Sequence, residues 1–192
     1  DQIYNAIKGY TNKEILEKAN YNIKLTNPID YIRNLNNGSV FRFVSTHPHM
    51  DHLTGIKSLN DEIGIGTLWI SKNSHTPDLG QLSDSQKEDW SFYKKYRDTN
   101  EYFLDGLYTI RPKDGDSNQY WREDNITILA PSTELLKSSN PNILSYVLLI
   151  NYGGKKIVLG GDGEKETWEY IMDNYADLIK DVSILKASHH GR

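Results

Sequence analysis

The segment Ser45–Gly55, STHPHMDHLTG, constrains this chain more than any other feature, because three histidines and an aspartate fall within six consecutive positions. The whole chain of 192 residues has only six histidines. A buried imidazole needs partners for two ring nitrogens, so histidines are rarely clustered for packing alone. Neutral imidazole is also the commonest side-chain metal ligand. His47, His49, Asp51 and His52 therefore form a candidate metal site, which needs a fold that brings further ligands to it.

The absence of cysteine limits the kinds of metal site that the chain can form. Without thiolates, the ligands must be imidazoles and carboxylates, and disulfides are excluded. The net charge is −4, so no overall basic field attracts nucleic acid. That balance weakens the case for a nucleic-acid substrate without excluding one, because an enzyme needs only a local patch and a bound cation.

Length and hydropathy indicate one domain of ordinary polarity. A chain of 192 residues is long enough for one substantial core and short for two. Hydrophobic residues make up 37% and charged residues 25%, and no apolar run approaches the roughly 18 residues of a membrane helix. The first residues lack the basic start and apolar core of a signal peptide. Together with the absence of cysteine, these features favour a cytoplasmic location.

Hydrophobic periodicity predicts a mixed α/β fold. Strands are expected at 39–46, 66–71 and 126–131, on both sides of the hairpin signal NYGGKK, and within DVSILKASHHGR. Helices are expected within NKEILEKANYNI (Ile15, Leu16, Ala19 and Ile23 on one face), LTGIKSLNDE, LSDSQKEDWSFYKKYRD, and EKETWEYIMDNYADLIK (Trp168, Ile171, Met172 and Tyr175 on one face). The turn-rich RPKDGDSNQYWREDN predicts an exposed loop.

The helix expected within LSDSQKEDWSFYKKYRD carries two signals of its own. Ser83 and Gln86 have the spacing of a capping box. Trp90, Tyr93 and Tyr96 follow at helical spacing. Such aromatic side chains can stack on nucleic-acid bases, but at this spacing they more often face a core, and we expect the core.

Ligand-type residues follow three of the predicted strands. The first histidine cluster follows the strand at 39–46, Asp162 follows the hairpin and two glycines, and His189 and His190 follow the last strand. Glycines let the backbone turn sharply, and loops at strand ends share one face of a sheet. The three segments are therefore predicted to meet at one edge.

The spacing within the first cluster predicts two metal positions. In an extended segment, His47 and His49 point the same way and can bind one ion. Asp51 and His52 are adjacent and diverge, so they can bind a second ion a few ångströms away. Two ions roughly 3.5–4 Å apart can clamp the attacking and leaving oxygens of a displacement.

Asp162 is then the natural bridging carboxylate, and His189 or His190 completes the second position. Each feature alone has an ordinary explanation: a His-x-His pair is often solvated surface, Asp162 can cap a helix, and a terminal His-His-Gly can come from a tag. Their joint occurrence after three strands favours the metal site. His75 is isolated in a polar loop, and we interpret it as a surface residue.

These motifs resemble one known family. THPHMDHLTG matches the His-x-His-x-Asp-His motif of the metallo-β-lactamase superfamily. NPNILSYVLLINYGGKKIVLGGDGEKE and DVSILKASHHGR resemble its competence-protein branch, the hydrolase domain of ComEC-like proteins. The resemblance implies a single αββα sandwich domain over 1–192, with metals at one edge of the paired sheets. It begins near Ser39, and residues 1–38 and 72–124 match the family poorly.

The resemblance also implies a role for each ligand-type residue. It places His47 and His49 on the first metal, Asp51 and His52 on the second, Asp162 on the bridge, and His189 as the last second-metal ligand, with His190 as its alternate. Asn142 and Ser145 fall where lactamase-like members keep a third histidine for the first metal. The ComEC-like branch shares this gap.

Two further departures from the family are apparent. The branch usually has serine after His-His-Gly, whereas this chain has Arg192, a candidate contact for a substrate phosphate. The superfamily also has an upstream strand ending in aspartate and continues beyond His-His-Gly. We therefore expect a fold that is incomplete at both ends.

The implied function is a metal-dependent hydrolase, a phosphodiesterase or nuclease acting on DNA through a metal-bound hydroxide. Asp51, His52 and Asp162 would be catalytic, and Lys186 or Arg192 would steady phosphate oxygens. The ligands suit one or two ions of zinc or manganese. Two alternatives stay open: a hydrolase of small esters, lactones or lactams, and a non-catalytic interaction module that retains the metal site. The sequence indicates no protein partner.

Overall fold

The computed structural model describes residues 14, 18, 26–35 and 38–191. The chain divides into two compact units, Asp1–Gly38 and Ser39–Arg192. In the first unit, helix α3 (Pro28–Leu35) begins after Asn27, whose side chain accepts a hydrogen bond from the Ile29 amide at 2.9 Å. The helix predicted around Ile15, Leu16, Ala19 and Ile23 lies outside the described residues.

The first sheet of the second unit is mostly parallel. Its strand order is β1 (Val40–Ser45), β2 (Ile65–Ile70), β4 (Leu107–Ile110) and β3 (Phe103–Leu104). β1 and β4 both run parallel to β2, and β3 is antiparallel to β4. Because parallel neighbours end at the same edge, the segments that follow β1 and β2 start side by side.

The second sheet is mostly antiparallel. Its order is β5 (Ile126–Ala130), β6 (Val147–Tyr152), β7 (Lys155–Leu159) and β8 (Ile184–Lys186), and only β7 and β8 are parallel. The predicted hairpin joins β6 to β7, and Gly153 and Gly154 both have the positive φ that such a turn requires.

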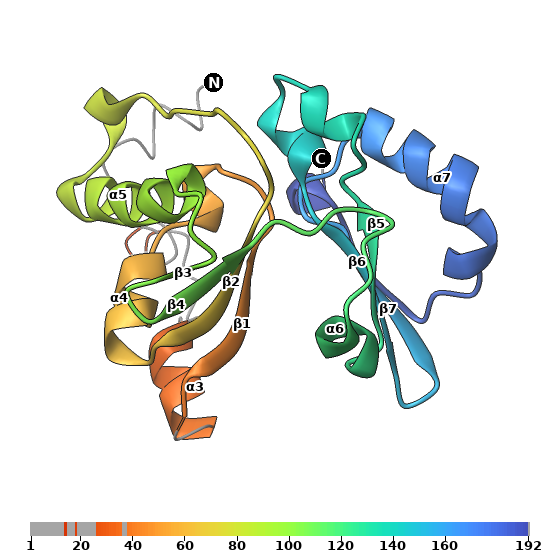
Figure 1. Ribbon diagram of the computed structural model, residues 1–192, viewed down its shortest axis with the longest axis horizontal. Helices are drawn as coiled ribbons and strands as arrows, with labels where there is room; N and C mark the ends of the chain where they lie inside the picture. Colours follow the sequence, from red (N-terminus) through yellow and green to blue (C-terminus); the bar gives the residue numbers. More distant parts are fainter. Residues whose placement is uncertain (1–13, 15–17, 19–25, 36–37, 192) are drawn as a thin grey trace. The chain divides into compact units, whose positions relative to one another are not determined.

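A core of aromatic and aliphatic side chains joins the two sheets. Trp69 on β2 packs with Ile128 and Leu148 of the second sheet and with Tyr146 and Trp121. Alternate residues of β5 and β6 face away from the first sheet. They pack against helix α7 (Lys165–Ile179). The helices α4 (Ile56–Glu62) and α5 (Asp84–Asp98) cover the outer face of the first sheet (Figure 1). The unit is thus a mixed α/β fold with helices outside two packed sheets.

Helix α5 confirms both signals read from its sequence. Ser83 and Gln86 form a complete capping box, and Trp90, Tyr93 and Tyr96 are all buried. Because all three side chains are buried, the stacking alternative is wrong in this fold.

The structure differs from the sequence prediction in three places. The segment 111–125, predicted as an exposed loop, contains the short helix α6 (Gln119–Glu123), because Trp121 is buried between the sheets. β3 and β4 have no counterpart in the prediction. Met172, expected with Ile171 on the packed face of α7, is 55% exposed. No helix within the described ranges is long and apolar enough to span a membrane.

Candidate metal centre

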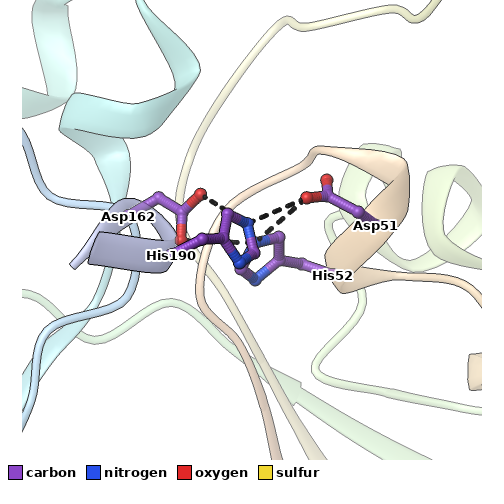
Figure 2. Close-up of side chains that lie close together, drawn as sticks. All are labelled: Asp51, His52, Asp162 and His190. Carbon is purple, nitrogen blue, oxygen red and sulfur yellow. Dashed lines mark hydrogen bonds and ion pairs between the residues drawn. The ribbon is translucent and has the colours of Figure 1, made fainter. Parts of the chain in front are cut away.

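Three segments bring ligand-type side chains together in the second unit. The first cluster lies in the turn after β1, which contains the short 3₁₀ helix Met50–His52. Asp162 follows β7, and His190 lies in a second 3₁₀ turn after β8, His189–Gly191. Figure 2 shows Asp51 and His52 facing Asp162 and His190 from opposite sides. The predicted meeting of three strand ends is therefore observed.

Four of these residues form one compact group. Asp51, His52, Asp162 and His190 each offer one ligand atom, and these atoms all lie within 4.8 Å of one another. His52 Nε2 lies 3.2 Å from Asp162 Oδ1 and 3.3 Å from His190 Nε2. His190 Nε2 lies 3.1 Å from Asp51 Oδ2. We call this group the second metal position.

Two further histidines lie beside this group. His47 Nε2 is 3.2 Å from His49 Nδ1 and 3.8 Å from Asp162 Oδ2. Two ligands at about 2.0–2.1 Å from a tetrahedral ion stand about 3.3 Å apart, so the His47–His49 separation matches a shared ion. We call His47, His49 and Asp162 the first metal position; it is the looser of the two, since among the described residues only the second has all of its ligand atoms within 4.8 Å of one another. Asp162 borders both positions, because its Oδ2 lies 3.8 Å from His47 and 3.4 Å from His190 and its Oδ1 faces His52.

The backbone around Asp162 is shaped by small residues. Gly161 has φ +52°, and a Cβ there would lie 2.9 Å from the Tyr146 carbonyl oxygen. Any residue with a Cβ at this position would therefore collide with the backbone at Tyr146. The Asp162 amide donates to Ser145 Oγ at 3.1 Å. These contacts orient the Asp162 carboxylate toward the histidines.

Burial keeps the imidazoles of the first position neutral. Burial, together with the nearby His52 and His49, lowers the pKa of His47 to about 3. Burial also lowers the pKa of His49. Burial alone would raise the pKa of Asp51, but His52, a backbone hydrogen bond and His190 outweigh it and lower that pKa. Neutral imidazole and ionised carboxylate are the forms that bind a metal.

The structure brings His190, the alternate, into the second position in place of His189. Both residues have positive φ, 47° and 56°, and this turn sends their side chains different ways. His189 Nδ1 lies 3.4 Å from Glu164 Oε1. Two asparagine amides, from Asn140 at 2.8 Å and Asn142 at 2.6 Å, also bond to Glu164. The side-chain amides of Asn140 and Asn142 thus fix the Glu164 carboxylate by hydrogen bonds. That carboxylate lies beside the His189 ring and away from the second metal position.

Two of the remaining candidates, Ser145 and Lys186, lie outside both positions. Ser145 is buried and supports the Asp162 backbone. Lys186 is exposed at the end of β8. Arg192 is beyond the described residues, so its proposed phosphate contact stays a prediction.

His75, interpreted from the sequence as a surface residue, lies against the site. Its ring centroid is 5.2 Å from that of His49 and 6.2 Å from that of Trp90. It is half-buried. One sequence feature could have indicated this position, namely that His75 shortly follows the strand predicted at 66–71. If that strand runs parallel to the strand before His47, both end at the same edge of the sheet. Sheet order was needed to use that feature.

The donor set fits a divalent metal. The Asp162 side chain is 3% exposed, and its Oδ1 has no hydrogen bond of suitable geometry among the described residues. A buried carboxylate is costly unless its negative charge is compensated, and the neighbouring imidazoles compensate it only when they are protonated. The close approach of two imidazole nitrogens is also unfavourable when both present lone pairs, and a cation between them removes both costs. No protein-family model and no curated protein sequence matches this chain.

Proposed function

We propose that this chain is a metal-dependent phosphodiesterase of metallo-β-lactamase type, with nucleic acid, and DNA in particular, as its substrate. The observation that carries the proposal is the buried Asp162 carboxylate, which faces His47 and His52 after β1 and His190 after β8. The resemblance of THPHMDHLTG and the closing His-His-Gly to that superfamily supports the same function.

Each of the two metal positions would hold one ion. His47 and His49 would hold the first ion, Asp51, His52 and His190 would hold the second, and Asp162 would contribute to both. The negative charge of Asp162 offsets the repulsion between two cations. Imidazole and carboxylate ligands suit zinc or manganese. A divalent ion bound here would lower the pKa of a coordinated water and neutralise charge on a phosphate.

Exposure indicates the side from which a substrate reaches the site. Asp51 and His190 have side chains 60% and 49% exposed, whereas His47 and Asp162 are buried. A phosphodiester therefore approaches over Asp51 and His190. The buried pair keeps the ligand geometry rigid behind them.

The test combines metals with substrates. The protein is stripped with chelator and reloaded with Mn²⁺, Zn²⁺ or Mg²⁺. Each form is assayed on single-stranded DNA, duplex DNA, RNA and a chromogenic phosphodiester, and on nitrocefin and a lactone. We expect uptake of up to two ions and cleavage of phosphodiesters. Hydrolysis of only nitrocefin or the lactone would replace our proposal with the small-substrate hydrolase.

Asp162→Asn provides the matched variant, because it keeps the size of the side chain and removes its charge. It should release one ion and reduce turnover by more than the ~10–100-fold that loss of an outer-shell partner causes. Asp61→Asn is the control, since Asp61 pairs with Lys57 on the exposed surface of α4. It should keep both ions and full turnover. Full activity in Asp162→Asn, or no metal uptake by the wild type, would contradict the proposal.

A further inference from the structure

A cavity of about 740 Å³ lies along the first sheet, apart from the metal centre. Its volume is within the range of roughly 300–1,000 Å³ that is typical of ligand sites. Phe41 and Arg42 near the start of β1, and Gly66 and Thr67 near the start of β2, line it together with residues of the segment 111–121. The first histidine cluster follows the end of β1, so the cavity lies toward the opposite edge of the sheet.

Exposed aromatic side chains surround this cavity. Four of its lining residues are aromatic and between 44% and 62% exposed, namely Phe41, Tyr102, Tyr108 and Tyr120. Single exposed apolar residues are common on protein surfaces, whereas a contiguous group marks an interaction site. The faces of aromatic side chains bind flat rings by stacking. The lining therefore suits a planar aromatic ligand.

The charged side chains that line the cavity already have partners. Arg42 Nη1 donates to Asp124 Oδ2 at 2.9 Å. Arg111 Nη2 donates to three backbone carbonyl oxygens at the end of α5, at 2.8–3.0 Å. Asp116 pairs with Lys113 at 3.4 Å. Because these cations are occupied, the cavity suits a neutral ring better than the phosphate groups of a free nucleotide.

Polar groups of the segment 111–121 can recognise the edge of such a ring. The Asp116 carboxylate has about four acceptor sites, and the amide and ammonium groups of Lys113 use two of them. Asn118 Oδ1 accepts from the Tyr120 amide at 3.0 Å, and the side-chain NH₂ of Asn118 is a donor. Carboxylate and amide side chains are those that proteins use to hydrogen-bond the edges of bases.

We propose that this cavity holds one unpaired base of a single-stranded nucleic acid whose scissile phosphodiester lies at the metal centre. The inference rests on the proposed function and names the substrate class of that site. The base stacks on the tyrosine rings while its sugar and phosphates stay in solvent, so no cation is needed inside the cavity. A duplex fits poorly, because its bases are already paired and extruding one costs free energy.

The first measurement is the affinity of the protein for a labelled single-stranded oligonucleotide in excess chelator, which prevents cleavage. Tyr102→Ala and Tyr120→Ala should each weaken binding by roughly 5–150-fold, the loss expected when one base loses one aromatic stacking partner. Tyr120→Phe keeps the ring and should bind as the wild type does. Tyr152→Ala is the control, because Tyr152 is an exposed tyrosine outside the cavity. Melting temperatures establish that each variant is folded.

The second measurement is turnover of the metal-loaded protein. Tyr120→Ala should raise KM for the single-stranded oligonucleotide and leave kcat unchanged, because the stacked base is remote from the reacting atoms. A chromogenic phosphodiester cannot reach the cavity from the metal centre, so wild type and Tyr120→Ala should cleave it at the same rate. Loss of activity on both substrates would mean that the substitution disturbs the fold and that the KM effect is not due to stacking.

The outcomes separate this inference from the proposed function. Equal affinity of wild type, Tyr102→Ala and Tyr120→Ala for the oligonucleotide would contradict the inference and leave the proposed function intact. Binding of AMP, GMP or a duplex as tightly as the single strand would rule out an unpaired base of a strand as the occupant. If the loaded protein cleaves no substrate, the proposed function fails, and the connection between this cavity and the metal centre fails with it. Tyrosine-dependent binding of the strand in chelator would then still support a base in the cavity.

Discussion

At the scale of single residues, His47 shows how burial prepares a ligand. Its side chain is fully buried among other imidazoles, and its pKa is lowered to about 3 by burial and by His52 and His49. The ring is therefore neutral over the whole physiological range and offers Nε2 to a metal without first losing a proton. The same shift makes the metal-free protein sensitive to acid.

We expect the free energy of unfolding of metal-free protein to fall as the pH drops from about 6.5 toward 3. His47 binds a proton near pH 6.5 when unfolded and only near pH 3 when folded. The unfolded state therefore holds more protons in this interval, so acid favours it, by at most about 1.4 kcal/mol per pH unit for one proton. Urea denaturation at several pH values measures the slope. His47→Gln should reduce it, and an unchanged slope would show that His47 does not contribute.

At the scale of elements, α5 supports the site from outside. It anchors the His75 loop through Tyr93 and Arg97. It also holds α4, because Asp89 accepts hydrogen bonds from the amides of Gly55 and Lys57 at 2.8 and 3.0 Å. A cap at the start of α5 therefore acts on two segments that adjoin the histidines.

We expect Ser83→Ala to reduce stability by about 1 kcal/mol, the typical loss for an N-cap. Ser83 Oγ accepts from the Gln86 amide at 3.3 Å, and alanine leaves that amide without this acceptor. Ser91→Ala is the control, because Ser91 is exposed within the same helix and alanine is the better helix former. Chemical denaturation measures both, and equal stability of the two variants would rule out the capping box as a significant contribution.

At the scale of the whole molecule, the metal centre connects the two sheets of the second unit. Its ligands follow β1 in one sheet and β7 and β8 in the other. An ion bound there would be held by the folded arrangement and not by the unfolded chain. Metal binding and folding would therefore be linked.

We expect zinc or manganese at 100 times its dissociation constant to stabilise the protein by about 2.7 kcal/mol. For a unit of this size, that corresponds to a rise in melting temperature of roughly 5–10 °C. Differential scanning calorimetry with metal, and then with excess chelator, measures the rise and its reversal. Asp162→Asn should show a smaller rise. A melting temperature that is independent of metal would mean that no ion binds the folded state preferentially.

The sequence by itself determined the local elements and the segments that carry ligands. Strand alternation, the NYGG turn and the Ser83–Gln86 box depend on residues close in the chain, so periodicity and turn chemistry predict them. The mixed α/β fold and the meeting of the first cluster with Asp162 and the final histidine pair followed from the same patterns. Most of the segment 111–125 is exposed, as predicted; its short helix α6 was not predicted, because it depends on the packing of Trp121 against distant strands.

Only the tertiary structure decided which side chains enter the site. The choice of His190 over His189 depends on two consecutive positive φ angles after β8 and on Glu164, which is held from another segment. The position of His75 depends on β2 being the parallel neighbour of β1. Both depend on contacts between residues far apart in the chain, and local sequence patterns contain no information about such contacts.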